Sequence, residues 1–184
     1  MPQTPLVVHV ADVETPLGTM VAAASDAQLL LLEFAHRRML ATQLKRVERA
    51  MVCVFEPGES PVLTGLRAQL DQYFRGERTQ FEVPIHTPGT PFQMRVWSEL
   101  RRIPAGTTTT YANMAAVVGQ PTAVRAVARA NGDNRISILI PCHRVIGSDG
   151  SLTGYGGGLW RKRRLLEIEG VTTPSRPYRR QSAL

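Results

Sequence analysis

A segment rich in proline and glycine, Thr87 to Pro91, separates two parts of the chain with different apolar periodicity. Upstream of it, apolar residues form strand-length runs at Val7 to Val13, Thr19 to Ala24 and Leu29 to Phe34, with turn residues between them. Downstream, apolar residues recur at helical spacing. The sequence therefore predicts an α/β protein, with a small α/β domain at residues 1–87 and a mostly helical domain at residues 88–170.

Two helices complete the predicted N-terminal domain. His36 to Glu48 has a helical pattern, and Val52 to Phe55 has the composition of a further strand. Ser60-Pro61 is a typical helix start, a cap residue followed by proline, and Gly76 ends that helix. The apolar residues of the second helix share one face: Leu63, Leu66, Leu70, Tyr73 and Phe74. No residue cluster here is typical of a catalytic site, so we expect a structural role for this domain.

The helical domain begins with a capping-box pattern. Thr90 to Gln93 has the required spacing, Pro91 occupies the first helical position, and the following apolar stripe places Trp97 in the core. Further on, Tyr111 to Val118 and Thr122 to Asn131 predict a helix-turn-helix, in which Thr122 caps the second helix.

The second of these helices carries two arginines on one face. Arg125 and Arg129 are four residues apart, and Ala123, Ala126 and Ala130 keep the helix surface shallow. Small side chains suit close approach to a nucleic-acid groove, and they suit packing against the protein itself equally well.

The chemistry of the chain centres on two adjacent residues, Cys142 and His143. A free thiol has a pKa of about 8.5, so a nucleophilic cysteine needs a base or a positive charge beside it, and His143 and Arg144 can supply both. Neighbours in a strand point to opposite faces, so their contact requires a water relay or an irregular backbone, which Pro141 favours. A buried inert cysteine is the commoner interpretation of such a pair alone.

The C-terminal half resembles the O6-alkylguanine-DNA alkyltransferase family, also called methylated-DNA-protein-cysteine methyltransferases. The matching residues lie in the same order over about the last hundred positions. They are Gly89 to Gln93, Val96-Trp97, Ile103 to Gly106, Tyr111, Ala123 to Ala128, Asn134, Ile138 to Val145, Gly154-Tyr155, Gly157 to Leu159, Leu165-Leu166 and Glu169-Gly170. The resemblance implies that the N-terminal domain has an RNase H-like fold.

The resemblance also implies roles for the reactive residues. Cys142 would accept the alkyl group of O6-alkylguanine in DNA irreversibly, after His143 has taken the thiol proton through a water. Glu169 would orient and charge-stabilise the imidazole, and Tyr111 would assist extrusion of the nucleotide and donate a hydrogen bond to guanine N3.

Further positions follow from the same resemblance. The second helix, with Ala123, Ala126 and Arg129, would face the minor groove, and Arg125 would enter the base stack when the damaged nucleotide leaves it. Asn134 would link this helix to the active site. Four more residues would support the site or line the base pocket: Arg144, Val145, Tyr155 and Gly157. Gly156, often serine in the family, would also line that pocket, and Ser137 stands where many members have proline.

Composition sets the remaining expectations. The net charge of +7 favours a polyanionic partner, here alkylated double-stranded DNA. The two cysteines form no Cys-x-x-Cys pair, and no apolar run could span a bilayer. We expect a monomeric, cytoplasmic protein that does not bind membranes and needs no cofactor or metal. Solvation explains most of the charges from Arg161 to Arg164, and residues 171–184 have the composition of a mobile basic tail.

Two other functions stay open from the residues alone. A thiol hydrolase could use Cys142, His143 and Glu169 over many turnovers. A regulator or damage sensor could bind DNA through the helix-turn-helix without chemistry. The sequence also leaves open whether O4-alkylthymine is repaired and whether copies bind DNA cooperatively.

Overall fold

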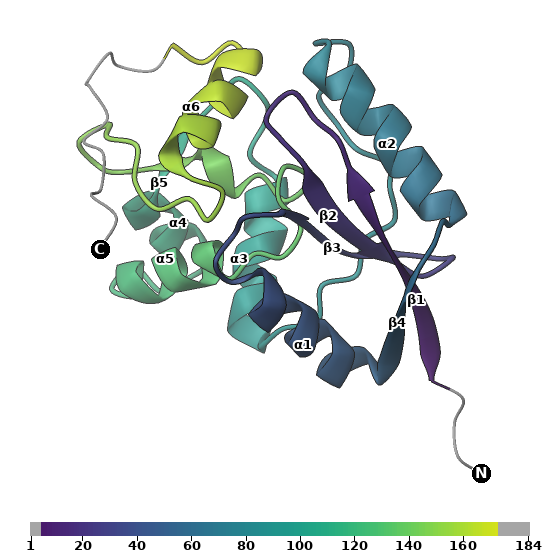
Figure 1. Cartoon of the computed structure of the whole chain (residues 1–184). Coiled ribbons are helices and arrows are strands. Elements are labelled where there is room, and N and C mark those ends of the chain that lie inside the picture. Colours follow the sequence, from purple (N-terminus) through teal and green to yellow (C-terminus); the bar gives the residue numbers. More distant parts are fainter. Residues whose placement is uncertain (1–4, 173–184) are drawn as a thin grey trace.

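A four-stranded sheet forms the first part of the computed structural model, which describes residues 5–172 (Figure 1). The strands are β1 (Leu6–Val13), β2 (Met20–Ala24), β3 (Leu29–Phe34) and β4 (Cys53–Pro57), in the order β3-β2-β1-β4. β2 pairs antiparallel with both β1 and β3, whereas β4 pairs parallel with β1. The three predicted runs before residue 35 are therefore confirmed as strands.

Helices cover both faces of this sheet (Figure 1). On one face, α1 (Leu40–Met51) packs its Val47 with Val8, Leu30 and Cys53. On the other face, α2 (Pro61–Phe74) contributes the apolar residues that the sequence placed on one side of the helix. Because both faces are covered, all six residues of β3 are buried.

The first helix starts later than predicted. It begins at Leu40 rather than His36, and it runs to Met51 rather than Glu48. The residues before it form turns, because the Arg37 side chain folds back into the protein and donates a hydrogen bond to the Asn134 carbonyl at 2.9 Å. The predicted start of α2 is confirmed, since the Ser60 hydroxyl accepts a hydrogen bond from the Leu63 amide.

The second part of the chain, as far as residue 172, is mostly helical, with two short strands and one 3-10 turn. They are α3 (Pro91–Arg101), β5 (Thr109–Thr110), α4 (Tyr111–Val117), α5 (Val124–Gly132), the 3-10 turn η1 (Cys142–Arg144), β6 (Val145–Ile146) and α6 (Leu159–Ile168). The capping box of Thr90 and Gln93 is confirmed. The predicted cap of α5 is wrong, because Thr122 lies in the preceding turn and Ala123 occupies the cap position without a side-chain hydrogen bond.

Backbone hydrogen bonds join the two parts of the chain. The Leu32 amide donates to the Arg135 carbonyl, and the Ser137 amide donates to the Leu32 carbonyl, both at 2.8 Å. Residues just before the Cys142 turn are thus paired with β3, the edge strand of the sheet. One apolar core also spans both parts, so the position of Cys142 depends on the N-terminal sheet.

Two of the four charges that open α6 are not solvated, contrary to expectation. Arg161 and Lys162 are both buried. The Arg161 side chain donates to the backbone carbonyls of Leu17 and Gly157. The Lys162 side chain donates to those of Val145 and Thr153. Carbonyl acceptors replace water for both cations. Most of the predicted tail, residues 173–184, lies outside the described residues.

Candidate active site

Cys142 lies at the end of two very tight turns. The Leu139 amide donates to the Ser137 carbonyl around Ile138, whose φ is +74°, and the Cys142 amide donates to the Ile140 carbonyl around Pro141. A positive φ at a β-branched residue costs about 1–3 kcal/mol and persists only where the surroundings enforce it. The irregular backbone that Pro141 led us to expect is therefore present, and it extends further upstream than expected.

Asn134 holds this irregular segment together. Its side-chain amide donates to the Ile140 carbonyl at 2.8 Å and to the Cys142 sulfur at 3.2 Å, while its side-chain oxygen accepts from the Ile136 amide. One buried amide thus fixes the turn and contacts the thiol. An asparagine can do so because it both donates and accepts hydrogen bonds.

His143 and Glu169 form a buried pair. The Nε2 atom of His143 lies 2.9 Å from the Glu169 carboxylate, and both side chains are essentially unexposed. With an ionised carboxylate as acceptor, Nε2 carries the proton and Nδ1 is free to accept one. Nδ1 is buried and has no hydrogen-bond partner among the described residues. No hydrogen bond joins His143 to the Cys142 thiol in this part of the chain.

The Glu169 carboxylate has two further partners. Arg144 donates to it through two nitrogens, each at 2.8 Å, in the planar two-point geometry that suits a guanidinium. Tyr73, on α2 of the sheet domain, donates its hydroxyl at 2.8 Å. The N-terminal domain therefore contributes a residue to the site, which the sequence did not indicate.

Burial and neighbouring charges set the protonation states. Burial raises the pKa of the Cys142 thiol and lowers the pKa of the His143 imidazole. For Glu169, burial acts against ionisation, but hydrogen bonds from His143 and Arg144 outweigh it and lower the pKa to about 2. At neutral pH the site thus holds a protonated thiol, a neutral imidazole and a carboxylate.

Several residues expected to line a base pocket lie close to one another in the same domain as the His143–Glu169 pair. The Tyr111 hydroxyl lies 3.3 Å and 3.4 Å from the carbonyl oxygens of Thr153 and Gly154. Lys162 bonds the carbonyls of Val145 and Thr153, and burial lowers its pKa to about 8. Tyr155 is half-buried, and its hydroxyl is buried with no hydrogen-bond partner among residues 5–172.

Glycine at position 156 has a steric cause. A Cβ atom there would lie 2.7 Å from the guanidinium carbon of Arg37, whose side chain is only 7% exposed and pairs with buried Glu33. A Cβ at Gly157 would lie 2.6 Å from the Phe34 ring. Phe34 at the end of β3 and Arg37 in the turn after it therefore fill the space that side chains at these two positions would need.

The helix expected to face the minor groove, α5, is exposed on one side. Arg125, Ala126 and Arg129 are exposed, and Ala123 is half-buried. Ala130 is buried instead, and its carbonyl accepts a hydrogen bond from the Trp97 indole at 2.8 Å. Trp97 is a core residue, as predicted.

Three side chains near the site were missed from the sequence: Tyr73, Arg37 and Lys162. For Tyr73 a signal existed, because a tyrosine on the apolar face of a helix needs a partner for its hydroxyl. Lys162 also lay on an apolar helix face, three residues after Leu159 and four before Leu166. Arg37 gave no such signal, since the Asn134 and Gly132 carbonyls that place it beside the site are nearly a hundred residues away, although its ion-pair partner Glu33 is near in sequence.

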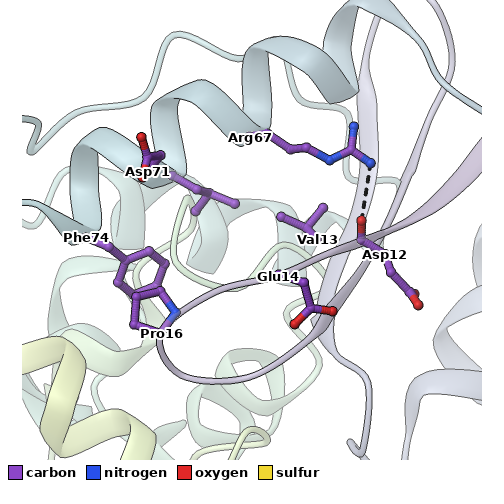
Figure 2. A pocket seen from close by; sticks show the side chains of 8 residues that line it. Asp12, Val13, Glu14, Pro16, Arg67, Asp71 and Phe74 are labelled. Carbon is purple, nitrogen blue, oxygen red and sulfur yellow. Dashed lines mark hydrogen bonds between the residues drawn. The ribbon is translucent and has the colours of Figure 1, made fainter.

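A separate cavity of about 370 Å³ lies between the end of β1 and α2 (Figure 2). Arg67 in its wall donates to the Asp12 carbonyl at 3.2 Å and pairs with Glu59. None of the proposed site residues lines it. Within residues 5–172, no cluster of three or more His, Cys, Asp or Glu side chains could hold a metal ion, and no helix is long and apolar enough to cross a membrane.

The fold and site together define a class: two-domain α/β proteins in which a buried cysteine, an imidazole–carboxylate pair and a helix-turn-helix share one domain. Residues 8–87 match the family model described as "6-O-methylguanine DNA methyltransferase, ribonuclease-like domain", and residues 91–171 match that described as "6-O-methylguanine DNA methyltransferase, DNA binding domain". The chain belongs to the 6-O-methylguanine DNA methyltransferase family.

Individual relatives agree with this assignment. A methylated-DNA–protein-cysteine methyltransferase of Mycobacterium tuberculosis is 40% identical over 174 residues, covering 91% of this chain and 96% of that protein. A constitutive methyltransferase of Bacillus subtilis is 42% identical over 161 residues, covering 86% and 93%. The crystal structure of Mycobacterium tuberculosis OGT in complex with DNA has a TM-score of 0.75 at 41% identity, covering 88% of this chain and 92% of that one. The activity of the chain is thus direct-reversal DNA repair by alkyl transfer to a cysteine.

Proposed function

We propose that Cys142 is the cysteine that receives the alkyl group from O6-alkylguanine in DNA. The observation that carries this is the buried His143, whose Nε2 is held by Glu169 while Nδ1 has no partner among the described residues. Because the pKa of the Cys142 thiol is raised, the sulfur can attack only after a nearby base has taken its proton. Cys53, the second cysteine, lies in β4 in the core against α1 and has no histidine partner among residues 5–172.

The proton of the thiol leaves through the imidazole. One bridging water carries it from the Cys142 sulfur to Nδ1 of His143, and the Glu169 carboxylate stabilises the imidazolium that forms. Arg144 and Tyr73 keep the carboxylate ionised and oriented. Because the resting thiol is protonated, it reacts little until a substrate is in place.

The transfer forms one bond and breaks one. The sulfur attacks the alkyl carbon, the bond between that carbon and guanine O6 breaks, and the electron pair goes to the guanine, which takes up a proton. Tyr111 beside the base pocket donates the hydrogen bond that stabilises the departing guanine. The thioether product is a poor leaving group, so each protein molecule acts once.

The damaged nucleotide must leave the duplex to reach a buried sulfur. We assign Arg125 to the vacated place in the base stack, with Ala123, Ala126 and Arg129 against the groove, since Arg125, Ala126 and Arg129 are exposed on α5. Val145, Tyr155, Gly156 and Gly157 form the base pocket, and Asn134 ties it to α5.

The remaining assignments concern partners and place. Alkylated double-stranded DNA is the proposed partner. The protein's net charge of +7 suits it to binding this polyanion. We propose a monomeric, cytoplasmic protein with a domain boundary at residues 87–88. Gel filtration and cell fractionation test the first two proposals, and a dimer or a membrane-associated pool would overturn them.

The experiment counts alkyl groups moved per protein molecule. After incubation with excess O6-methylguanine duplex, we expect one methyl group on the peptide that contains Cys142, and none on the peptide that contains Cys53. Cys53→Ala is the matched control and keeps the transfer, whereas Cys142→Ala keeps DNA binding and loses it. Many methyl groups released per molecule would indicate a hydrolase, and none would indicate a DNA-binding regulator.

Two further variants test the individual roles. His143→Gln should slow transfer by about 10² to 10⁴ in rate, the usual contribution of general base catalysis, while exposed His86→Gln leaves the rate unchanged.

Arg125→Ala should weaken repair of a duplex more than reaction with the free base. Equal losses for both substrates would contradict the extrusion role.

A further inference from the structure

A groove of about 790 Å³ lies beside α5, between α1 of the sheet domain and the start of α3. Arg46 and Arg49 line it from α1, Arg129 lines it from α5, and Arg135 lies in its wall. We call this surface the arginine groove. It faces a different part of the domain from the Cys142 turn, which does not line it.

Positive charge in the arginine groove exceeds negative charge. Asp133 is the one acidic residue that lines it, against four arginines. Its carboxylate accepts from Arg46 at 3.0 Å and from the Gln93 amide at 3.0 Å, so it is already occupied. The groove therefore carries an uncompensated positive charge that favours an anionic occupant.

The four arginines differ in their freedom to bind an anion. Arg135 is buried, donates to the Pro88 carbonyl and stacks over the Trp97 ring with 5.8 Å to its centroid. Arg49 and Arg129 are exposed, and their side chains have no hydrogen bond or ion pair with any described residue. Burial, and then the nearby charge of Arg46, lower the pKa of Arg135. This repulsion between cations is a cost that a bound anion would relieve.

The arginine groove is continuous with the helix assigned to DNA. Ala126, which is exposed on α5 next to Arg125, lines the groove together with Arg129. This helix lies in the segment that matches the DNA binding domain of the family. A strand of DNA that follows α5 beyond the lesion would therefore pass the outer end of α1.

We propose that the arginine groove binds the phosphodiester backbone of DNA flanking the lesion, so that α1 of the sheet domain is part of the DNA interface. This inference rests on the proposed function for the placement of DNA on α5. Contacts to phosphates are independent of sequence, and they position the protein on the duplex rather than select the base. Arg49 is the residue freest to make such a contact.

The test changes the charge of the groove in both directions at exposed positions of α1. Arg49→Ala should weaken binding of an undamaged duplex several-fold, and the slope of log affinity against log salt should shrink by about 0.9 for one lost phosphate contact. Ala50→Lys should steepen that slope. Arg101→Ala is the matched control: Arg101 is exposed at the opposite end of α3 and does not line the groove, so this variant should change neither quantity.

The outcomes separate this inference from the proposed function. Unchanged affinity and slope in both α1 variants would overturn it, and so would a change in oligomeric state without a change in slope. Methyl transfer to Cys142 from the free base reports on the chemistry alone, because that reaction needs no phosphate contact. If the wild-type chain fails that assay but the salt slopes shift as expected, the proposed function fails and the groove stands.

Discussion

Glu169 shows how a single residue can link chemistry to stability. Its carboxylate takes four hydrogen bonds, from His143, from two nitrogens of Arg144 and from Tyr73. Those bonds offset the cost of burying the charge, and because they are made to the ionised carboxylate they favour that form over the protonated one. The sequence alone could not distinguish this residue from a solvated carboxylate at the end of a helix.

The lowered pKa of Glu169 makes stability depend on acid. A folded-state pKa of about 2, against an ordinary 4.5, means that ionised Glu169 stabilises the fold above about pH 4.5 and that this contribution is lost as pH falls towards 2. The shift corresponds to about 3 kcal/mol. Urea unfolding across this range should show a steeper fall for the wild type than for Glu169→Gln. Parallel curves for the two proteins would show that Glu169 is not the group responsible.

At the scale of elements, local signals predicted most of the fold. β1, β2 and β3 are bounded by turn residues, and α2 and α3 begin with caps followed by proline, so neighbours in the sequence were sufficient to predict them. Local signals failed where a distant contact decides. The chain between β3 and α1 forms turns because Arg37 reaches Asn134, and the cap of α5 is Ala123 because the preceding turn includes Thr122.

Two glycines in different elements give opposite predictions. Gly65 lies inside α2, and a Cβ there would meet no atom within 4 Å, so Gly65→Ala should stabilise the protein by about 0.5–1 kcal/mol through the entropy of the unfolded chain. Gly156→Ala should destabilise it by about 1–3 kcal/mol, because Arg37 is held by Glu33 and Asn134 and cannot simply move aside. Chemical denaturation of both variants checks the signs, and the same sign for both would contradict the packing described around Arg37.

At the scale of the whole molecule, both domains contribute to the candidate active site. The α2 hydroxyl of Tyr73 reaches Glu169, and β3 pairs with the segment that leads to Cys142. The sequence resemblance placed the reactive residues in the second domain and left the first a structural role. Contacts between residues about a hundred positions apart have no periodic signature, so only the folded chain shows them.

Removing one hydroxyl tests this dependence. Tyr73→Phe keeps the ring packed in the core but deletes the 2.8 Å hydrogen bond to Glu169, so the free energy of unfolding should fall by about 1.5–3 kcal/mol. Methyl transfer should also slow, because the carboxylate loses one of the bonds that orient it. Unchanged unfolding and transfer rate would mean that the sheet domain does not support the site.

The pairing between β3 and residues 135–137 has a consequence for how the protein loses its activity. Separating β3 from residues 135–137 would displace the turn around Pro141, because the hydrogen bonds of Leu32 fix where that turn begins. Alkyl transfer would then be lost even in molecules whose helices are still folded. The extent of alkyl transfer therefore reports whether β3 and residues 135–137 remain paired.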